Sequence, residues 1–186
     1  MVFIIAAGIA LAVQSLPAAV KTRSEFDKMF DFRMVRTWAW HPDGAGQVIA
    51  SRTQSDDPEA IRALVEPIIQ SNVDAEMPRR GLTRSASAPD LQLRYYLLLS
   101  VGQSAQTVGQ FLPSTTQWGI PPFTQATSSL EIMERGSLVL DLSTKSGLVW
   151  RGVAEAKIEL GLEQDKRRKL LEEAVREILK RYPPKR

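Results

Sequence analysis

The stretch "GSLVLDLSTKSGLVWRGVAEAKIEL", residues 136–160, contains the clearest structural pattern in the chain. Two alternating apolar segments flank the turn residues "STKSG", which predicts a long β-hairpin. Pairing Leu142 with Leu148 places Leu140 opposite Trp150, and the even positions of both strands are then apolar or small. We expect this even side to face the core, because side chains on a strand alternate between its two faces.

The odd side of the same hairpin carries charged residues. In this register Asp141 and Arg151 are diagonal neighbours of opposite charge, and Arg135 lies opposite Glu155. We predict an ion pair between Asp141 and Arg151 at the surface, with Trp150 in the core. The alternative interpretation is a binding site around Trp150 and Arg151.

The rest of the chain predicts an α+β fold. Short strands are expected at 36–40 ("RTWAW") and 89–100, where the odd residues from Leu91 to Leu99 are apolar. Asp57 and Pro58 begin a helical pattern that contains Pro67, so either one helix kinks there or a new helix spans 67–80, and we expect the second. The last segment is strongly amphipathic and predicts a helix that ends before Pro183. The expected order is strand, helix, strand, strand, strand, helix, with a small antiparallel sheet and two helices packed on one face.

Residues 101–128 are rich in Gly, Gln, Ser, Thr and Pro. Three aromatic residues are scattered among them: Phe111, Trp118 and Phe123. We interpret this segment as a flexible insertion within a single domain spanning 21–186, and its aromatic residues as a possible contact with a partner protein.

The first twenty residues contain no charged side chain, and their apolar core runs from Val2 to Val13. This length is typical of the apolar region of a signal peptide and is short for a membrane span. Small residues follow, with possible cleavage after Ser15 or Ala18. The alternatives are a cleaved signal peptide, an uncleaved N-terminal anchor with membrane association, and a buried helix. The first two predict a periplasmic or cell-envelope location.

Composition excludes several chemistries. The chain has no cysteine, so disulfides, thiolate catalysis and lipidation through cysteine are ruled out. A single histidine, His41, makes a multi-histidine metal site or a Ser-His-Asp triad hard to build. The net charge of +3 comes mainly from residues 163–186, and we interpret these basic residues as the solvated face of a helix. We therefore expect no metal, no cofactor and no nucleic-acid binding.

Six short motifs follow one another along about residues 26–184: "VRTWAW", "RRGL", "DLQLRY", "GSLVLDL", "LVWRGVA" and the closing "RYPP". In this order they resemble one bacterial envelope family, which is often lipoprotein-like and is catalogued as domain of unknown function number 4136. The resemblance implies an exported α+β domain with no known catalytic residues. The positions that match the family motifs, and to which we assign structural roles, are Trp38, Trp40, Gly81, Asp90, Gly136, Asp141, Trp150, Arg151 and Gly152.

Functionally, the sequence favours a non-enzymatic envelope module that binds a partner protein, through either the sheet edge or the insertion at 101–128. A carrier of an apolar ligand or lipid is the first alternative, because the alternating leucines of 91–99 could line a cavity. An enzyme is the second alternative, although no phosphate loop, dinucleotide fingerprint, nucleophile elbow or metalloprotease motif is present.

Overall fold

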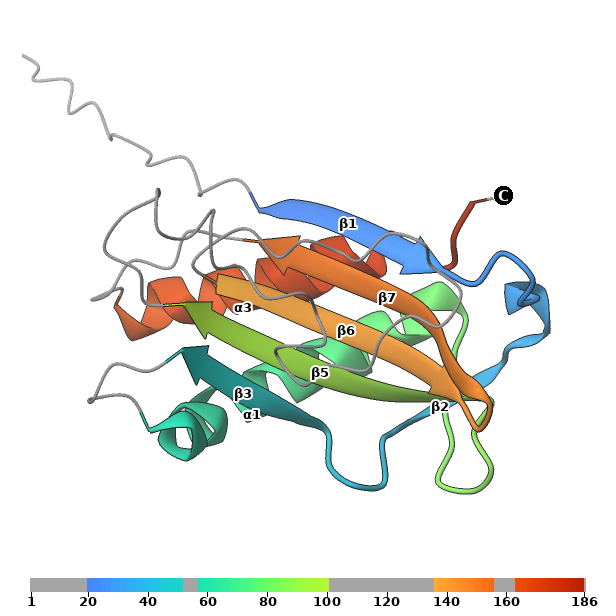
Figure 1. Cartoon of the computed structure of the whole chain (residues 1–186), viewed down its shortest axis with the longest axis horizontal. Helices are drawn as coiled ribbons and strands as arrows, with labels where there is room; N and C mark the ends of the chain where they lie inside the picture. Colours follow the sequence, from blue (N-terminus) through green and yellow to red (C-terminus); the bar gives the residue numbers. More distant parts are fainter. Residues whose placement is uncertain (1–19, 52–56, 101–135, 156–162, 186) are drawn as a thin grey trace, which may run out of the picture.

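A computed structural model describes residues 20–51, 57–100, 136–155 and 163–185 of the 186-residue chain. Within these ranges one seven-stranded sheet is covered on one face by two helices (Figure 1). The strands lie in the order β1-β7-β6-β5-β2-β4, and β3 also pairs with β5. The α+β class and the placement of both helices on one face are confirmed.

Three strands form the antiparallel centre of the sheet. β5 (Leu91–Ser100) pairs with β6 (Gly136–Thr144), and β6 forms the predicted hairpin with β7 (Gly147–Glu155). The predicted register was wrong by two residues, since Leu142 lies opposite Trp150 and not opposite Leu148. The register shifts after Leu142, where β7 contains one extra residue, Val149. From Leu142 and Trp150 to the far ends of the hairpin, a two-residue error leaves each side chain on its predicted face. Val149 at the bulge is the exception, since it packs in the main core and not on the predicted outer side.

Of the other four strands, β1 to β4, the sequence predicted only β2. β1 (Lys21–Phe26) extends the hairpin by pairing antiparallel with β7. β2 (Thr37–Trp40) was predicted, whereas β3 (Gly46–Ser51) and the two-residue β4 (Thr83–Arg84) were not. β2 and β3 both pair parallel with β5, so the sheet is mixed and not antiparallel throughout as predicted. The chain passes from β3 to the parallel strand β5 through a crossover that contains a helix. Such a helical crossover is the usual link between parallel strands.

That crossover contains α1 (Pro58–Glu76), which runs without interruption through Pro67 and is followed by the short 3-10 helix η2 (Pro78–Arg80). The expectation of a separate helix at 67–80 was therefore wrong. Asp57 caps the helix as predicted, and its carboxylate accepts a hydrogen bond from the Glu59 backbone N–H at 3.0 Å. Pro67 is exposed. The backbone carbonyl that its ring leaves unbonded can therefore reach water.

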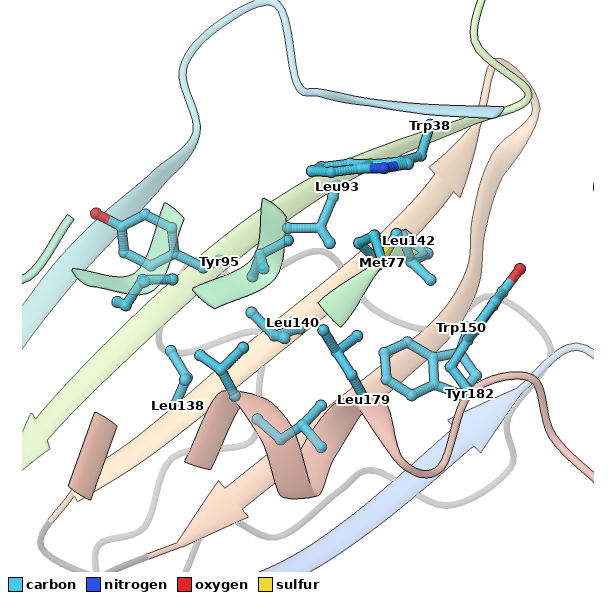
Figure 2. Packing of buried hydrophobic residues seen from close by; sticks show 14 of the residues in the cluster. Trp38, Met77, Leu93, Tyr95, Leu138, Leu140, Leu142, Trp150, Leu179 and Tyr182 are labelled. Carbon is cyan, nitrogen blue, oxygen red and sulfur yellow. The ribbon is translucent and has the colours of Figure 1, made fainter. Parts of the chain in front are cut away.

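The second helix, α3 (Gln164–Leu179), lies beside α1 on the same face of the sheet. Its buried stripe follows the predicted spacing and includes Leu171, Ala174, Val175 and Ile178. These side chains share one apolar core with α1, β5, β6 and β7, in which Trp150 lies toward one end beside Tyr182 (Figure 2). Tyr182, after the helix, packs against Trp150 with ring centroids 5.6 Å apart.

Two predictions fall outside the described residues. They are the signal peptide or anchor at 1–20, apart from Val20 itself, and the insertion at 101–128 with Phe111, Trp118 and Phe123. Among the helices that the structure does describe, none has the length and apolar character needed to cross a membrane.

Candidate interaction site

The family-motif residues of β7 hold the core together. Trp150 is fully buried, as the core interpretation requires. Next to it, a Cβ atom added to Gly152 would lie 2.4 Å from Cγ2 of Ile178. Glycine at this position therefore lets α3 pack close to the sheet. Gly136 is buried at the start of β6.

Asp141 and Arg151 form a bidentate ion pair, with Nε–Oδ1 and Nη2–Oδ2 distances of 2.7 and 2.6 Å. The predicted pairing is confirmed, and the two residues lie directly opposite each other on β6 and β7. The predicted surface location was wrong, because the two residues are only 5% and 2% exposed. They lie on the outer face, by which we mean the face of the sheet opposite α1 and α3.

This pair belongs to a row of alternating charges across four strands. The register places Glu25 of β1 opposite Arg151, and Arg94 of β5 opposite Asp141. Burial raises the pKa of Glu25, and the nearby guanidinium of Arg151 opposes that rise. An ordered row of opposite charges gives each strand one preferred register, so we assign it a structural role.

The outer face also has a small apolar cluster beside the charge row: Tyr96, Leu98, Val139 and Val153, with Ile49 packed against it. The Arg94 guanidinium lies 5.8 Å from the centre of the Tyr96 ring. No such second cluster was predicted from the alternation of β5 and β6, which pointed to a single apolar face.

The tryptophans of β2 have structural surroundings. Trp38 is 1% exposed, and its ring meets that of Trp40 edge to face at 5.5 Å. A buried Trp38 cannot serve as an open platform for a sugar or peptide. His41 follows β2 and accepts a hydrogen bond from the Asp43 backbone N–H. The described residues contain no group of three or more side chains suited to hold a metal ion.

Asp90 fastens β2 to the start of β5. Its carboxylate accepts hydrogen bonds from the backbone N–H groups of Arg36 and Thr37 and from the Thr37 hydroxyl, at 2.8–2.9 Å. These bonds hold the pKa of Asp90 below its usual range. Gly81 ends η2 with a φ of 79°, a left-handed conformation that favours glycine. Both motif positions therefore shape the backbone.

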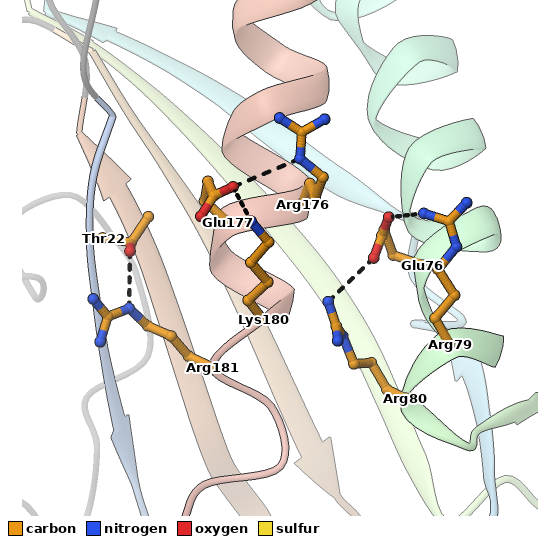
Figure 3. A network of polar contacts seen from close by, with 8 residues as sticks. All are labelled: Thr22, Glu76, Arg79, Arg80, Arg176, Glu177, Lys180 and Arg181. Atoms are coloured by element: carbon orange, nitrogen blue, oxygen red, sulfur yellow. Dashed lines mark hydrogen bonds and ion pairs between the residues drawn. The ribbon is translucent and has the colours of Figure 1, made fainter.

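The two long edges of the sheet remain as candidate contact surfaces, and they differ. β1 forms one edge and carries Lys21, Arg23 and Glu25. Arg23 forms an ion pair with Glu155 of β7, and the Nε of Arg181 donates a hydrogen bond to the Thr22 hydroxyl at 2.8 Å (Figure 3). Charged side chains on an edge strand oppose pairing with another chain.

On the opposite side of the sheet, β4 ends the part beside β2, and β3 forms the edge beside the second half of β5. None of the six residues of β3 is charged. The Tyr95 backbone N–H donates to the Ala45 carbonyl at 2.9 Å, so the backbone carbonyl of Ala45 points toward β5. This bond shows which residues of β3 point their backbone groups toward β5 and which point them outward. Alternate residues bond to the same neighbour, so the backbone groups of Gly46, Val48 and Ala50 point away from β5. Of the strands that the structure describes, none pairs with this outward side.

A polar group on α1 lies above β3. The Tyr95 ring occupies the space where a Gly46 side chain would be, since an added Cβ would lie 2.2 Å from it. The Tyr95 hydroxyl donates a hydrogen bond to Glu66 of α1 at 2.8 Å. Burial, this bond and the charge of Glu66 raise the pKa of Tyr95. Arg62 also acts electrostatically on Tyr95, and it pairs with Glu59 at 2.7 Å.

Sequence reasoning missed this edge because "GQVIAS" is short and is rich in small residues. A usable signal was the turn sequence "HPDGAG" between two short apolar segments, which is compatible with one edge strand interrupted by a loop. The described part of the chain is thus an α+β domain with an apolar core, a row of alternating charges whose central pair is buried, and an uncharged edge strand, β3.

The chain belongs to the family defined by the domain of unknown function DUF4136, which matches residues 22–184. A solved DUF4136 protein from Bacteroides thetaiotaomicron is 14% identical, with a TM-score of 0.48 over 91% of this chain and 97% of that one. A PDZ domain protein from Parabacteroides distasonis is 12% identical, with a TM-score of 0.50 over 90% of this chain and 36% of its own. A PelC dodecamer from Paraburkholderia phytofirmans is 7% identical, with a TM-score of 0.32 over 87% and 96%. No curated protein matches the chain.

Proposed function

We propose that this protein is a non-enzymatic, exported module of the cell envelope that binds a partner protein by pairing its β3 edge with a strand of that partner. The single observation that carries the proposal is the uncharged β3, whose outward backbone groups are ready to form a strand pair. The charge-free segment Val2–Val13 supports export.

The motif residues support a binding role over a catalytic one. Each has a structural explanation, from the core position of Trp150 to the close helix contact at Gly152. The most buried charges, Asp141 and Arg151, bind each other. A side chain already engaged in a buried ion pair is poorly placed to transfer protons to a substrate.

The carrier alternative has less support. The alternating β5 side chains that could line a ligand cavity are Leu91, Leu93, Tyr95 and Leu97, and all four belong to the same packed cluster as α1 and α3. A ligand between the sheet and the helices would have to displace these contacts.

Site-specific photo-crosslinking in the producing cell tests the proposed edge. A photoreactive phenylalanine analogue replaces Gln47, which is exposed on β3, or Lys28, which is exposed just beyond β1. We expect crosslinked protein from position 47 and none from position 28. Equal crosslinking from both positions, or none from either, would contradict the proposal.

Two proline variants sharpen the test. Val48→Pro removes an outward N–H from β3, and Ser24→Pro removes an outward N–H from β1. The Asp27 N–H bonds to the Val149 carbonyl, so by alternation the backbone N–H of Ser24 points away from β7. Crosslinking from position 47 should disappear in Val48→Pro and persist in Ser24→Pro. Circular dichroism confirms that both variants remain folded.

A further inference from the structure

We infer that the strand received by the β3 edge is β3 of a second copy of this chain, so that two sheets join across a two-fold axis. The inference rests on the proposed function and names the partner of the same edge. A partner of this kind presents an uncharged edge strand, and β3 itself is such a strand, whose outward backbone groups pair with none of the strands that the structure describes.

The backbone geometry fits antiparallel self-pairing. Gly46, Val48 and Ala50 all turn their backbone groups outward, so a two-fold axis at Val48 pairs Val48 with its own copy and Gly46 with Ala50. In this register all three outward residues of each strand have a partner. The two copies would form one continuous sheet.

The side chains also match in this register. Gln47 lies opposite Ile49 of the other copy on the outer face, and Val48 lies opposite Val48 on the helix face. No two like charges meet across the strands, because β3 has none. By contrast, two β1 strands would bring Lys21, Arg23 and Glu25 into contact with the charges of another copy.

The flank of α1 that lies over β3 carries charges that can pair with those of the same flank in a second copy. Glu66 reaches Tyr95 above Gly46, and Arg62 lies near the same hydroxyl, so this flank of α1 stands over β3. A two-fold axis through β3 brings two such flanks side by side. Each flank carries Glu59, Arg62 and Glu66, so the arginine of one copy can face a glutamate of the other.

Pairing of this kind closes at two copies. A two-fold interface uses the same surface on both partners, and each chain has one β3. The charged β1 edges then lie at the two ends of the joined sheet, where they oppose further addition of strands. The product is a dimer and not a fibre.

Spin labelling tests this arrangement on the full chain, because the absence of cysteine allows a single label to be placed cleanly. Single-cysteine variants Gln47→Cys and Lys28→Cys carry a nitroxide. Two labels at position 47 should lie within about 20 Å of each other, and two at position 28 should lie at least about 40 Å apart, or nine strand spacings. A dimer that shows the short distance at position 28 would overturn the inference.

Sedimentation equilibrium with three variants completes the test. Val48→Pro should raise the dimer dissociation constant at least 100-fold, and Gln47→Lys, an exposed substitution that leaves β3 intact, should raise it about tenfold. Ser24→Pro should leave the constant within about twofold. A wild-type chain that stays monomeric would overturn the inference. If position 47 then still crosslinks to a different protein, the proposed function survives, and if it crosslinks to nothing, both fail.

Discussion

The two edge strands β1 and β3 differ in how far they are protected against pairing with a strand of another chain. β1 carries three charged residues, pairs Arg23 with Glu155 of its neighbour and accepts a hydrogen bond from Arg181. β3 carries no charge, and its outward backbone groups face away from every strand that the structure describes. Edge strands are protected in most folded proteins, so an edge that no described strand covers, in the same sheet as a protected one, supports the proposed partner contact at β3.

The charge row follows the same division. It starts at Glu25 in β1, runs through Arg151 and Asp141, and ends at Arg94 in β5. Opposite Arg94 the edge breaks between β2 and β3, where residues 41–45 loop out. Ion pairs on the outer face therefore set the register of the strands from β1 to β5. β3, by contrast, packs through apolar contacts and against the Tyr95 ring.

The largest expected effect comes from breaking the charge row. Asp141→Leu leaves Arg151 buried without its main counterion and should lower the free energy of unfolding by about 3–5 kcal/mol. The double variant Asp141→Leu/Arg151→Met should regain most of that loss. Urea unfolding measures both. If the single variant is as stable as the wild type, the row has no structural role.

A smaller effect is expected from filling the space beneath Tyr95. Gly46→Ala places a Cβ atom 2.2 Å from the ring, so β3 must shift, and the free energy of unfolding should fall by about 1–3 kcal/mol. Dimer formation should weaken as well. Gly152→Ala in β7, the neighbour of β1, is the matched control, since its Cβ would lie 2.4 Å from Ile178. It should cost similar stability and leave dimer formation unchanged, and the opposite pattern would reverse the comparison.

The smallest effect concerns the pH dependence of the hydrogen bonds by which Asp90 holds Arg36 and Thr37, here called the Asp90 clamp. The pKa of Asp90 is lowered in the folded state, so its ionised form stabilises the protein above the pKa of the unfolded chain. That stability is lost as the pH falls through the lowered folded pKa. The stability difference between wild type and Asp90→Asn, measured by thermal unfolding, should thus be present at neutral pH and vanish in strong acid. A difference that does not change with pH would contradict the assigned clamp.

The sequence predicted the parts of the fold that depend on local alternation. The faces of the hairpin except at Val149, the odd side of β5 and the stripe of α3 all follow from spacing alone. The hairpin register could not be predicted, because the extra residue Val149 leaves no mark in the pattern. Pro67 misled the helix assignment, since only tertiary packing shows that its side of α1 is exposed.

The candidate site was less predictable than the fold. The pairing of Asp141 with Arg151 was visible in the sequence, but their burial depends on both faces of the sheet. β1 resembles a polar segment because three of its six residues are charged, and only its pairing with distant β7 makes it a strand. The openness of β3 is a property of sheet order, which no local pattern contains.

Native mass spectrometry of the chain isolated from the cells that produce it tests the central claim most directly. The prediction is a particle with the mass of two identical chains and no bound small molecule, which becomes a single chain in Val48→Pro and remains double in Ser24→Pro. A single chain that carries a lipid would contradict the claim and favour the carrier function. A dimer that Val48→Pro leaves intact would place the contact away from β3.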